Sequence, residues 1–425
     1  RGEPVARFAA FVGGGLWVAG DQLLKLEVVP TGNRLLVQDV EDVHFGDTFD
    51  GPLTVIERVV VHARRPKDGA GVIVSANETA SGRTLWETTL AVPAAGAPAV
   101  NTQGPRISAA ATSGAAFLLD RQSFSRRVQD ESQRAASADA VYDSVVDLGA
   151  GRLAIGAVGS QTVLHLRPGA PRGAVRSLEL PGELSCELTP WGGWFVAPTS
   201  VGQVAVYDAD TAELVATPFS PAVAPGQQVP WLVPAPYSTA DAPMLVASDG
   251  SKKLYLLGLE KEPAPHFKAM AEANLADAKL VGRIVAIGNQ AFAVSEQGAL
   301  RTYALPSLEE GQPVEIGAAV SWGPFAVGDK LLLATADSEL VCVAPGGGVA
   351  WRTPLEGRLP MGKPLGDGGS ALLLSASELL RVSLETGEVA GSIALDQPAA
   401  FGPVAFNKRL VVAGHDGSLL VVEKP

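Results

Sequence analysis

The sequence predicts an all-β protein, specifically a β-propeller of four-stranded antiparallel blades. The stretch from Lys330 to Pro425 contains three copies of one pattern: an apolar run, a small or polar turn, and a second apolar run that begins at Leu340, Leu379 or Leu419. These leucines are 39 and 40 residues apart. A period of about 40–45 residues with strand-like halves is typical of propellers, in which each repeat forms one small sheet.

Prolines supply a second, independent marker of the same period. Pro52, Pro324, Pro364 and Pro403 each precede a short apolar run, and the last three are 40 and 39 residues apart. Proline has no N–H group and is tolerated at the first residue of a strand. We therefore expect each of these prolines to open the innermost strand of a blade.

The pattern extends over the whole chain as ten repeat units. The first residue of the second apolar run marks each unit, and the markers are Leu23, Val72, Phe117, Val163, Val204, Leu254, Leu300, Leu340, Leu379 and Leu419. The first unit is expected to form strands over residues 5–14, 16–22, 23–29 and 34–40, and the second over residues 51–58, 59–65, 71–82 and 84–90. Units three to seven are centred on residues 106–120, 152–166, 194–217, 243–259 and 290–305. Several strands alternate apolar with polar residues, and others are continuously apolar, as expected where neighbouring blades cover both faces.

These repeats predict a single propeller of seven to ten blades over residues 1–425. The alternative is a partial propeller or outlying blades in residues 1–124, followed by a seven-bladed propeller in residues 140–425, with the polar stretch Ser125 to Asp139 between them. The last unit has no fourth strand after Leu419 to Pro425. We expect Gly2 to Phe8 to pair with the exposed edge and close the ring.

Charge and cysteine content exclude several classes of protein. The net charge of −12 argues against general nucleic-acid binding and against anionic membranes. No apolar run approaches the ~18 residues of a membrane helix, so no membrane insertion is expected. The basic residues at Arg64 to Lys67 and between Arg121 and Arg134 are expected on the solvated surface. Cys186 and Cys342 are expected to be buried free thiols, because two distant cysteines fit neither a disulfide scaffold nor a multi-cysteine zinc site.

The turns between the expected third and fourth strands resemble those of pyrroloquinoline-quinone-type (quinoprotein-like) propeller repeats. The resemblance is carried by residues 75–86 (SANETASGRTLW), 207–215 (YDADTAELV), 344–351 (APGGGVAW) and 383–391 (SLETGEVAG). In such a turn an Asp or Asn side chain caps the backbone, Gly takes a positive φ, and a Trp packs between blades. Only Trp86 and Trp351 stand at the position of the docking Trp. The sequence has no adjacent cysteines and none of the family's cofactor residues, so the resemblance implies the non-catalytic branch and no cofactor.

Local motifs give little support for other chemistry. Gly357 to Pro364 (GRLPMGKP) matches a P-loop except at Pro364, where the metal-binding Ser or Thr should stand, so a strand start is the better interpretation. Asp208 and Asp210 are spaced as in a calcium loop, but the remaining ligands do not follow. The five histidines share no spacing typical of a metal site, and they are His44, His62, His165, His266 and His415. We therefore predict no catalytic and no metal-binding residues.

Aromatic residues are the remaining candidates for binding. Trp191, Trp194, Trp231 and Trp322 lie in or beside expected inner strands. They are expected either in the core between blades or, alternatively, on a contact surface for a partner at one mouth of the ring.

The sequence thus favours a non-enzymatic scaffold or protein-interaction module with an unidentified protein partner, in an exported or envelope-associated bacterial protein. The corresponding location is periplasmic, envelope-associated or extracellular. Two alternatives stay open: a quinone- or metal-dependent oxidoreductase, and a binder of a small ligand or polysaccharide in the propeller channel.

Overall fold

The computed structural model describes residues 6–44, 47–49, 51–64, 72–91, 93–101, 106–119, 141–168, 175–224, 226–238, 242–275, 279–414 and 417–425. Within these ranges the chain forms only β-structure, arranged as ten antiparallel sheets of three or four strands. Every repeat marker lies in the third strand of its sheet, so the predicted fold class and the ten repeat units are confirmed. No helix within these ranges could cross a membrane.

The contacts divide the chain into two compact units, with the first sheets up to Pro93 in one unit and the sheets from Ala94 onward in the other. The division therefore follows the second repeat unit. The prediction of a single propeller over residues 1–425 did not include this division. The predicted alternative cut, at Ser125 to Asp139, lies outside the described residues.

The first unit consists of two four-stranded sheets. One sheet has the order β1-β2-β3-β4 and the other β5-β6-β7-β8. Their strands are β1 (Ala6–Val12), β2 (Gly15–Gly20), β3 (Leu23–Thr31), β4 (Arg34–His44), β5 (Thr54–Ile56), β6 (Val59–Arg64), β7 (Val72–Glu78) and β8 (Thr84–Ala91). Trp17, Ala19 and Leu23 of the first sheet pack with Val60 of the second, so the two sheets share one core. The predicted closure of the ring by the N-terminal segment is wrong for Ala6 to Phe8, because these residues pair with β2. Residues 2–5 lie outside the described ranges.

The second unit contains eight sheets within the described residues. Their strands are β9 (Ala99–Asn101), β10 (Arg106–Ala110), β11 (Ala116–Leu119); β12 (Ser144–Asp147), β13 (Leu153–Gly156), β14 (Thr162–Leu166), β15 (Val175–Glu179); β16 (Thr189–Trp191), β17 (Trp194–Pro198), β18 (Val204–Asp208); β19 (Ala235–Ser238), β20 (Pro243–Ser248), β21 (Lys253–Glu260), β22 (His266–Asn274); β23 (Leu280–Ile287), β24 (Gln290–Ser295), β25 (Ala299–Ala304), β26 (Val314–Glu315); β27 (Val320–Val327), β28 (Lys330–Thr335), β29 (Glu339–Val343), β30 (Val349–Pro354); β31 (Met361–Asp367), β32 (Ser370–Leu374), β33 (Glu378–Ser383), β34 (Val389–Ala394); and β35 (Phe401–Phe406), β36 (Arg409–Ala413), β37 (Leu419–Val422).

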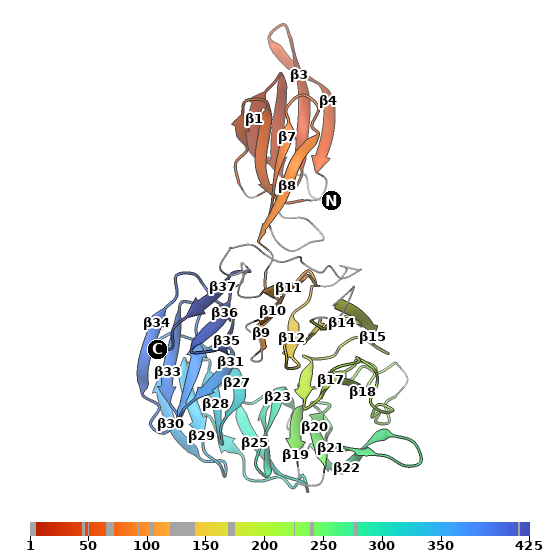
Figure 1. Ribbon diagram of the computed structural model, residues 1–425, viewed down its shortest axis with the longest axis vertical. Coiled ribbons are helices and arrows are strands. Elements are labelled where there is room, and N and C mark those ends of the chain that lie inside the picture. Colours follow the sequence, from red (N-terminus) through yellow and green to blue (C-terminus); the bar gives the residue numbers. More distant parts are fainter. Residues whose placement is uncertain are drawn as a thin grey trace. The chain divides into compact units, whose positions relative to one another are not determined.

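These eight sheets are the blades of a ring (Figure 1). From β12 to β35 the first strand of each blade contacts the first strand of the next, and β35 of the last blade contacts β9 of the first. The ring therefore closes between the blades β35–β37 and β9–β11. The last residues of the chain bind the blade β31–β34, where Lys424 pairs with Asp367 at 2.6 Å and Arg381 donates to the Pro425 carbonyl at 2.6 Å.

Three of the marker prolines lie inside their strands instead of opening them. Pro324, Pro364 and Pro403 fall where the pairing of β27, β31 and β35 with the next strand is interrupted. A bulge leaves residues without a ladder hydrogen bond, so proline's missing N–H costs nothing there. Pro52 precedes β5, as predicted.

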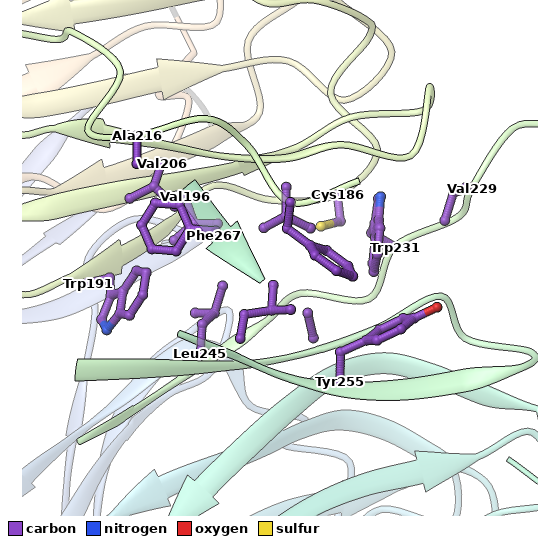
Figure 2. Packing of buried hydrophobic residues seen from close by; sticks show 14 residues of the cluster. Cys186, Trp191, Val196, Val206, Ala216, Val229, Trp231, Leu245, Tyr255 and Phe267 are labelled. Carbon is purple, nitrogen blue, oxygen red and sulfur yellow. The ribbon is translucent and has the colours of Figure 1, made fainter. Parts of the chain in front are cut away.

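Apolar side chains fill the spaces between blades, and Figure 2 shows one such cluster. Val196 and Val206 from the blade β16–β18 meet Leu245 and Tyr255 from the blade β19–β22. Cys186 and Cys342 are free and buried, as predicted. Burial raises the pKa of both thiols, that of Cys342 to about 11.

Candidate functional site

Three charged residues from three different blades converge at the centre of the ring. Glu187 lies two residues before β16, the first strand of the blade β16–β18, while Arg283 lies on β23 and Lys363 lies on β31. Arg283 Nη2 is 2.7 Å from Glu187 Oε2, although these blades are not neighbours in the ring. Such a contact requires that both side chains reach inward, Arg283 from the innermost strand of its blade and Glu187 from the segment before β16.

Two aromatic rings connect this ion pair to β31. The Arg283 guanidinium carbon lies 4.5 Å from the centre of the Phe325 ring, a cation–π contact. Phe325 in turn lies 4.8 Å from Trp322, measured between ring centroids. The Trp322 indole donates a hydrogen bond of 2.8 Å to the carbonyl of Gly362, the residue before Lys363. The backbone that carries Lys363 is thus held by the neighbouring blade.

Lys363 is the cation of this site that has no partner. Its side chain is exposed, and within the described residues it makes neither an ion pair nor a hydrogen bond. Loss of hydration lowers the pKa of the Lys363 ammonium, and the Arg283 charge lowers it further, while Glu187 opposes both. A partly desolvated ammonium beside a second cation gains stability from an added anion. The arrangement therefore suits the binding of a carboxylate or another oxyanion.

The four predicted tryptophans occupy two kinds of place. Trp191 and Trp231 are each 3% exposed and belong to the core between the blades β16–β18 and β19–β22. Their side chains are therefore not available to a partner: the candidate role in partner binding is wrong for these two residues, and they occupy the interblade core. Trp194 is half-buried against the same core. Trp322 is half-buried and supports the ring centre through Gly362.

Two features that the resemblance implied are present, the capped turn at Asp208 and the packed Trp351. The Asp208 carboxylate accepts hydrogen bonds from the backbone N–H groups of Asp210 and Thr211, which lowers its pKa. Asp210 has a different role, because its carboxylate pairs with Arg152 of the preceding blade. Trp351 packs on the following blade and donates to the Leu384 carbonyl at 2.9 Å.

Trp86 differs from Trp351, because it lies on β8, the edge strand of its sheet, and is 49% exposed. A tryptophan that docks between blades should be largely buried. The docking role that the resemblance implied for Trp86 is therefore not realised within the described residues.

Two of the histidines are buried, and each has a hydrogen-bonding partner, a backbone carbonyl for His165 and a side-chain amide for His62. His165 is buried, and its Nε2 lies 2.9 Å from the carbonyl of Ala209 in the turn of the next blade. His62 is buried in the first unit, and its Nε2 lies 2.7 Å from Asn77 Oδ1. Burial lowers the pKa of both rings, that of His62 to about 4. His415 lies outside the described residues, and the described ones hold no cluster of three or more His, Cys, Asp or Glu suited to a metal ion.

Arg64 corrects the prediction of a solvated basic stretch. Its side chain is 8% exposed and binds two carboxylates, with Nη1 2.5 Å from Asp47 Oδ2 and Nη2 2.8 Å from Glu87 Oε2. The sequence showed only a cluster of like charges. The two acids come from separate segments, so their approach to Arg64 depends on the fold.

Sequence reasoning missed Glu187, Arg283 and Lys363 as a group. Lys363 appeared only as the lysine of a rejected P-loop, and no local pattern marked the other two. The one available signal was position, because Arg283 and Lys363 both fall in the first strand of a repeat unit. Positions in the first strand point toward the ring axis more often than positions in the outer strands.

No family model and no curated protein matches the sequence. Solved structures do match. Sqt1 from Saccharomyces cerevisiae is 12% identical, with 79% of this chain and 97% of that chain covered and a TM-score of 0.58. The computationally designed protein Ika8 is 11% identical, with 79% and 97% covered and a TM-score of 0.52. BamB from Moraxella catarrhalis is 14% identical, with 88% and 96% covered and a TM-score of 0.46. The topology and the likeness to Sqt1 define the chain as a β-propeller protein.

Proposed function

We propose that this chain is a non-enzymatic propeller scaffold that binds an acidic segment of a protein partner at the ring centre. The observation that carries the proposal is Lys363, a cation that makes no ion pair or hydrogen bond within the described part of the chain and lies near the Arg283–Glu187 ion pair. A carboxylate beside Lys363 would offset the lost hydration of the ammonium.

The non-enzymatic part of the proposal is supported by the state of the usual catalytic groups. His62 and His165 are buried and engaged with Asn77 and the Ala209 carbonyl. Both thiols are buried with raised pKa values, so neither is a ready nucleophile. The finer assignments also remain part of this proposal: the quinoprotein-like branch of the propellers, and an exported or envelope-associated bacterial protein.

Binding of a labelled hexaglutamate peptide, followed by fluorescence anisotropy, tests the proposed site. The wild-type protein should bind this peptide in spite of its own net charge of −12, and binding should weaken as salt is added. Lys363→Gln should weaken binding about tenfold, in line with the loss of one partner of a desolvated charge pair. Lys279→Gln is the matched control, because Lys279 is an exposed lysine already paired with Glu296 at 3.1 Å.

Two results would overturn the proposal. One is equal binding by Lys363→Gln and Lys279→Gln, which would remove the ring centre as the site. The other is dye reduction by the wild-type protein after reconstitution with pyrroloquinoline quinone and calcium, which would establish the oxidoreductase alternative instead.

A further inference from the structure

The outer face of the β1–β4 sheet in the first unit is an exposed apolar surface. Cross-strand partners lie on the same face of a sheet, so the register assigns its members. Ala9 pairs with Val18, Phe11 with Leu16, Leu26 with Val40, and Val28 with Val37. With their neighbours, the members are Ala9, Phe11, Leu16, Val18, Leu24, Leu26, Val28, Leu35, Val37 and Val40. The register also assigns Pro30, the partner of Leu35, and Asp42, the partner of Leu24, to this face. All four strands therefore contribute, and Asp42 is the charged member that the register places among the apolar ones.

The opposite face of the same sheet is already used. Trp17, Ala19 and Leu23 pack on that side with Val60 of β6. The outer face consequently points away from the second sheet. Its exposure is large for apolar residues: 67% for Phe11, 73% for Leu35 and 55% for Val37.

A blade in a closed ring is covered on both faces by its neighbours, and the second unit follows this rule. Within the described residues of the first unit, the β1–β4 sheet packs on one other sheet, β5–β8, and only its inner face takes part in that core. A contiguous apolar face of this extent marks an interaction site in a soluble protein. The surface that fits it best is another apolar sheet packed face to face.

We propose that the occupant of this face is the same face of a second copy of the chain. A twofold pairing brings a surface against itself and therefore requires self-complementarity, which a face that is apolar apart from Asp42 on the edge strand β4 provides. Four strands over about eight residues span roughly 500 Å², so two copies bury roughly 1,000 Å² in total, which reaches the lower limit of specific interfaces. The inference concerns the first unit alone and does not depend on the ring centre.

Sedimentation velocity of the full chain tests the proposal between about 1 and 100 μM. The wild-type protein should form dimers, and added salt should raise the dimer population because it screens the repulsion between two chains of net charge −12. Val37→Asp should raise the dissociation constant at least about tenfold, because it places a carboxylate inside the apolar contact.

Leu36→Asp is the matched control. Leu36 is the next residue of β4, and it pairs with Val29 on the opposite face. It is 53% exposed, nearly the same as Val37. This variant should keep the wild-type dimer.

Phe11→Asp, on the far edge strand of the same face, should weaken the dimer as Val37→Asp does. A circular dichroism spectrum and melting temperature equal to those of the wild type would show that each variant is folded. A monomeric wild-type protein at every concentration would overturn the proposal. So would equal weakening by Leu36→Asp and Val37→Asp, or a dimer that salt dissociates.

Discussion

The indole N–H of Trp322 donates to the carbonyl of Gly362 across 2.8 Å, joining β27 to β31 in the next blade. Trp351 makes an equivalent bond to Leu384 across 2.9 Å, between the same two blades. The two bonds are alike in type and length. They differ in place, because only the first is adjacent in sequence to Lys363.

Replacing Trp322 with phenylalanine should therefore affect the ring centre as well as stability. Trp322→Phe and Trp351→Phe each remove one hydrogen bond and should each lower the free energy of unfolding by about 1–2 kcal/mol, measured by urea denaturation. Only Trp322→Phe should also weaken binding of the hexaglutamate peptide. Equal peptide binding by the two variants would show that Trp322 has no positioning role.

Lys363 should be unusually reactive toward acylating reagents. Its lowered pKa leaves a larger neutral amine fraction at pH 8 than an ordinary lysine has, and its side chain is exposed. Brief treatment with acetic anhydride followed by peptide mass spectrometry should find Lys363 modified before Lys279. Saturation with the hexaglutamate peptide should protect Lys363 and leave Lys279 unchanged. Slower modification of Lys363 than of Lys279 would contradict the assigned pKa shift.

The first unit should lose stability as the pH falls below neutral. Burial lowers the pKa of His62 from 6.5 to about 4, so protonation favours the unfolded state. The stabilising contribution is complete above pH 6.5 and is lost as the pH falls toward 4. The linkage relation gives a loss of about 2 kcal/mol between pH 7.5 and pH 5.

Hydrogen exchange of the β6 and β7 peptides, corrected for intrinsic rates, measures this change in opening free energy. His62→Gln keeps a donor for Asn77 but cannot titrate, so it should show a smaller pH dependence. His44, whose pKa is also lowered, should supply what remains. An unchanged pH dependence in His62→Gln would exclude His62 as the titrating group.

Arg64 should be among the most sensitive charged residues of the first unit. Arg64→Met removes the guanidinium that binds the Asp47 carboxylate, whose side chain is 13% exposed, and a broken buried ion pair costs about 3–5 kcal/mol. Arg409→Met is the control, because Arg409 and its partner Glu423 are 59% and 66% exposed. A pair exposed to that degree contributes about 0–1 kcal/mol. Comparable melting temperatures for the two variants would contradict the burial of Arg64.

The local pattern of the chain was sufficient for the blades. Leu340, Leu379 and Leu419 recur because each lies in the third strand of its blade, and this periodicity is carried by the order of residues along the chain. The Asp208 turn was also predictable, since its hydrogen bonds join residues two and three positions apart.

Only the tertiary structure decided which residues meet across blades. Glu187 and Arg283 are 96 positions apart, so a repeat of about 40 residues does not predict that these two side chains meet. The same holds for Arg64, which resembles a surface residue until Asp47 and Glu87 are placed beside it. Repetition fixes where each strand lies within its blade, because pairing within a blade is local. Charge partners at the ring centre and the boundary at Pro93 depend on how the blades assemble, which is a property of the whole fold.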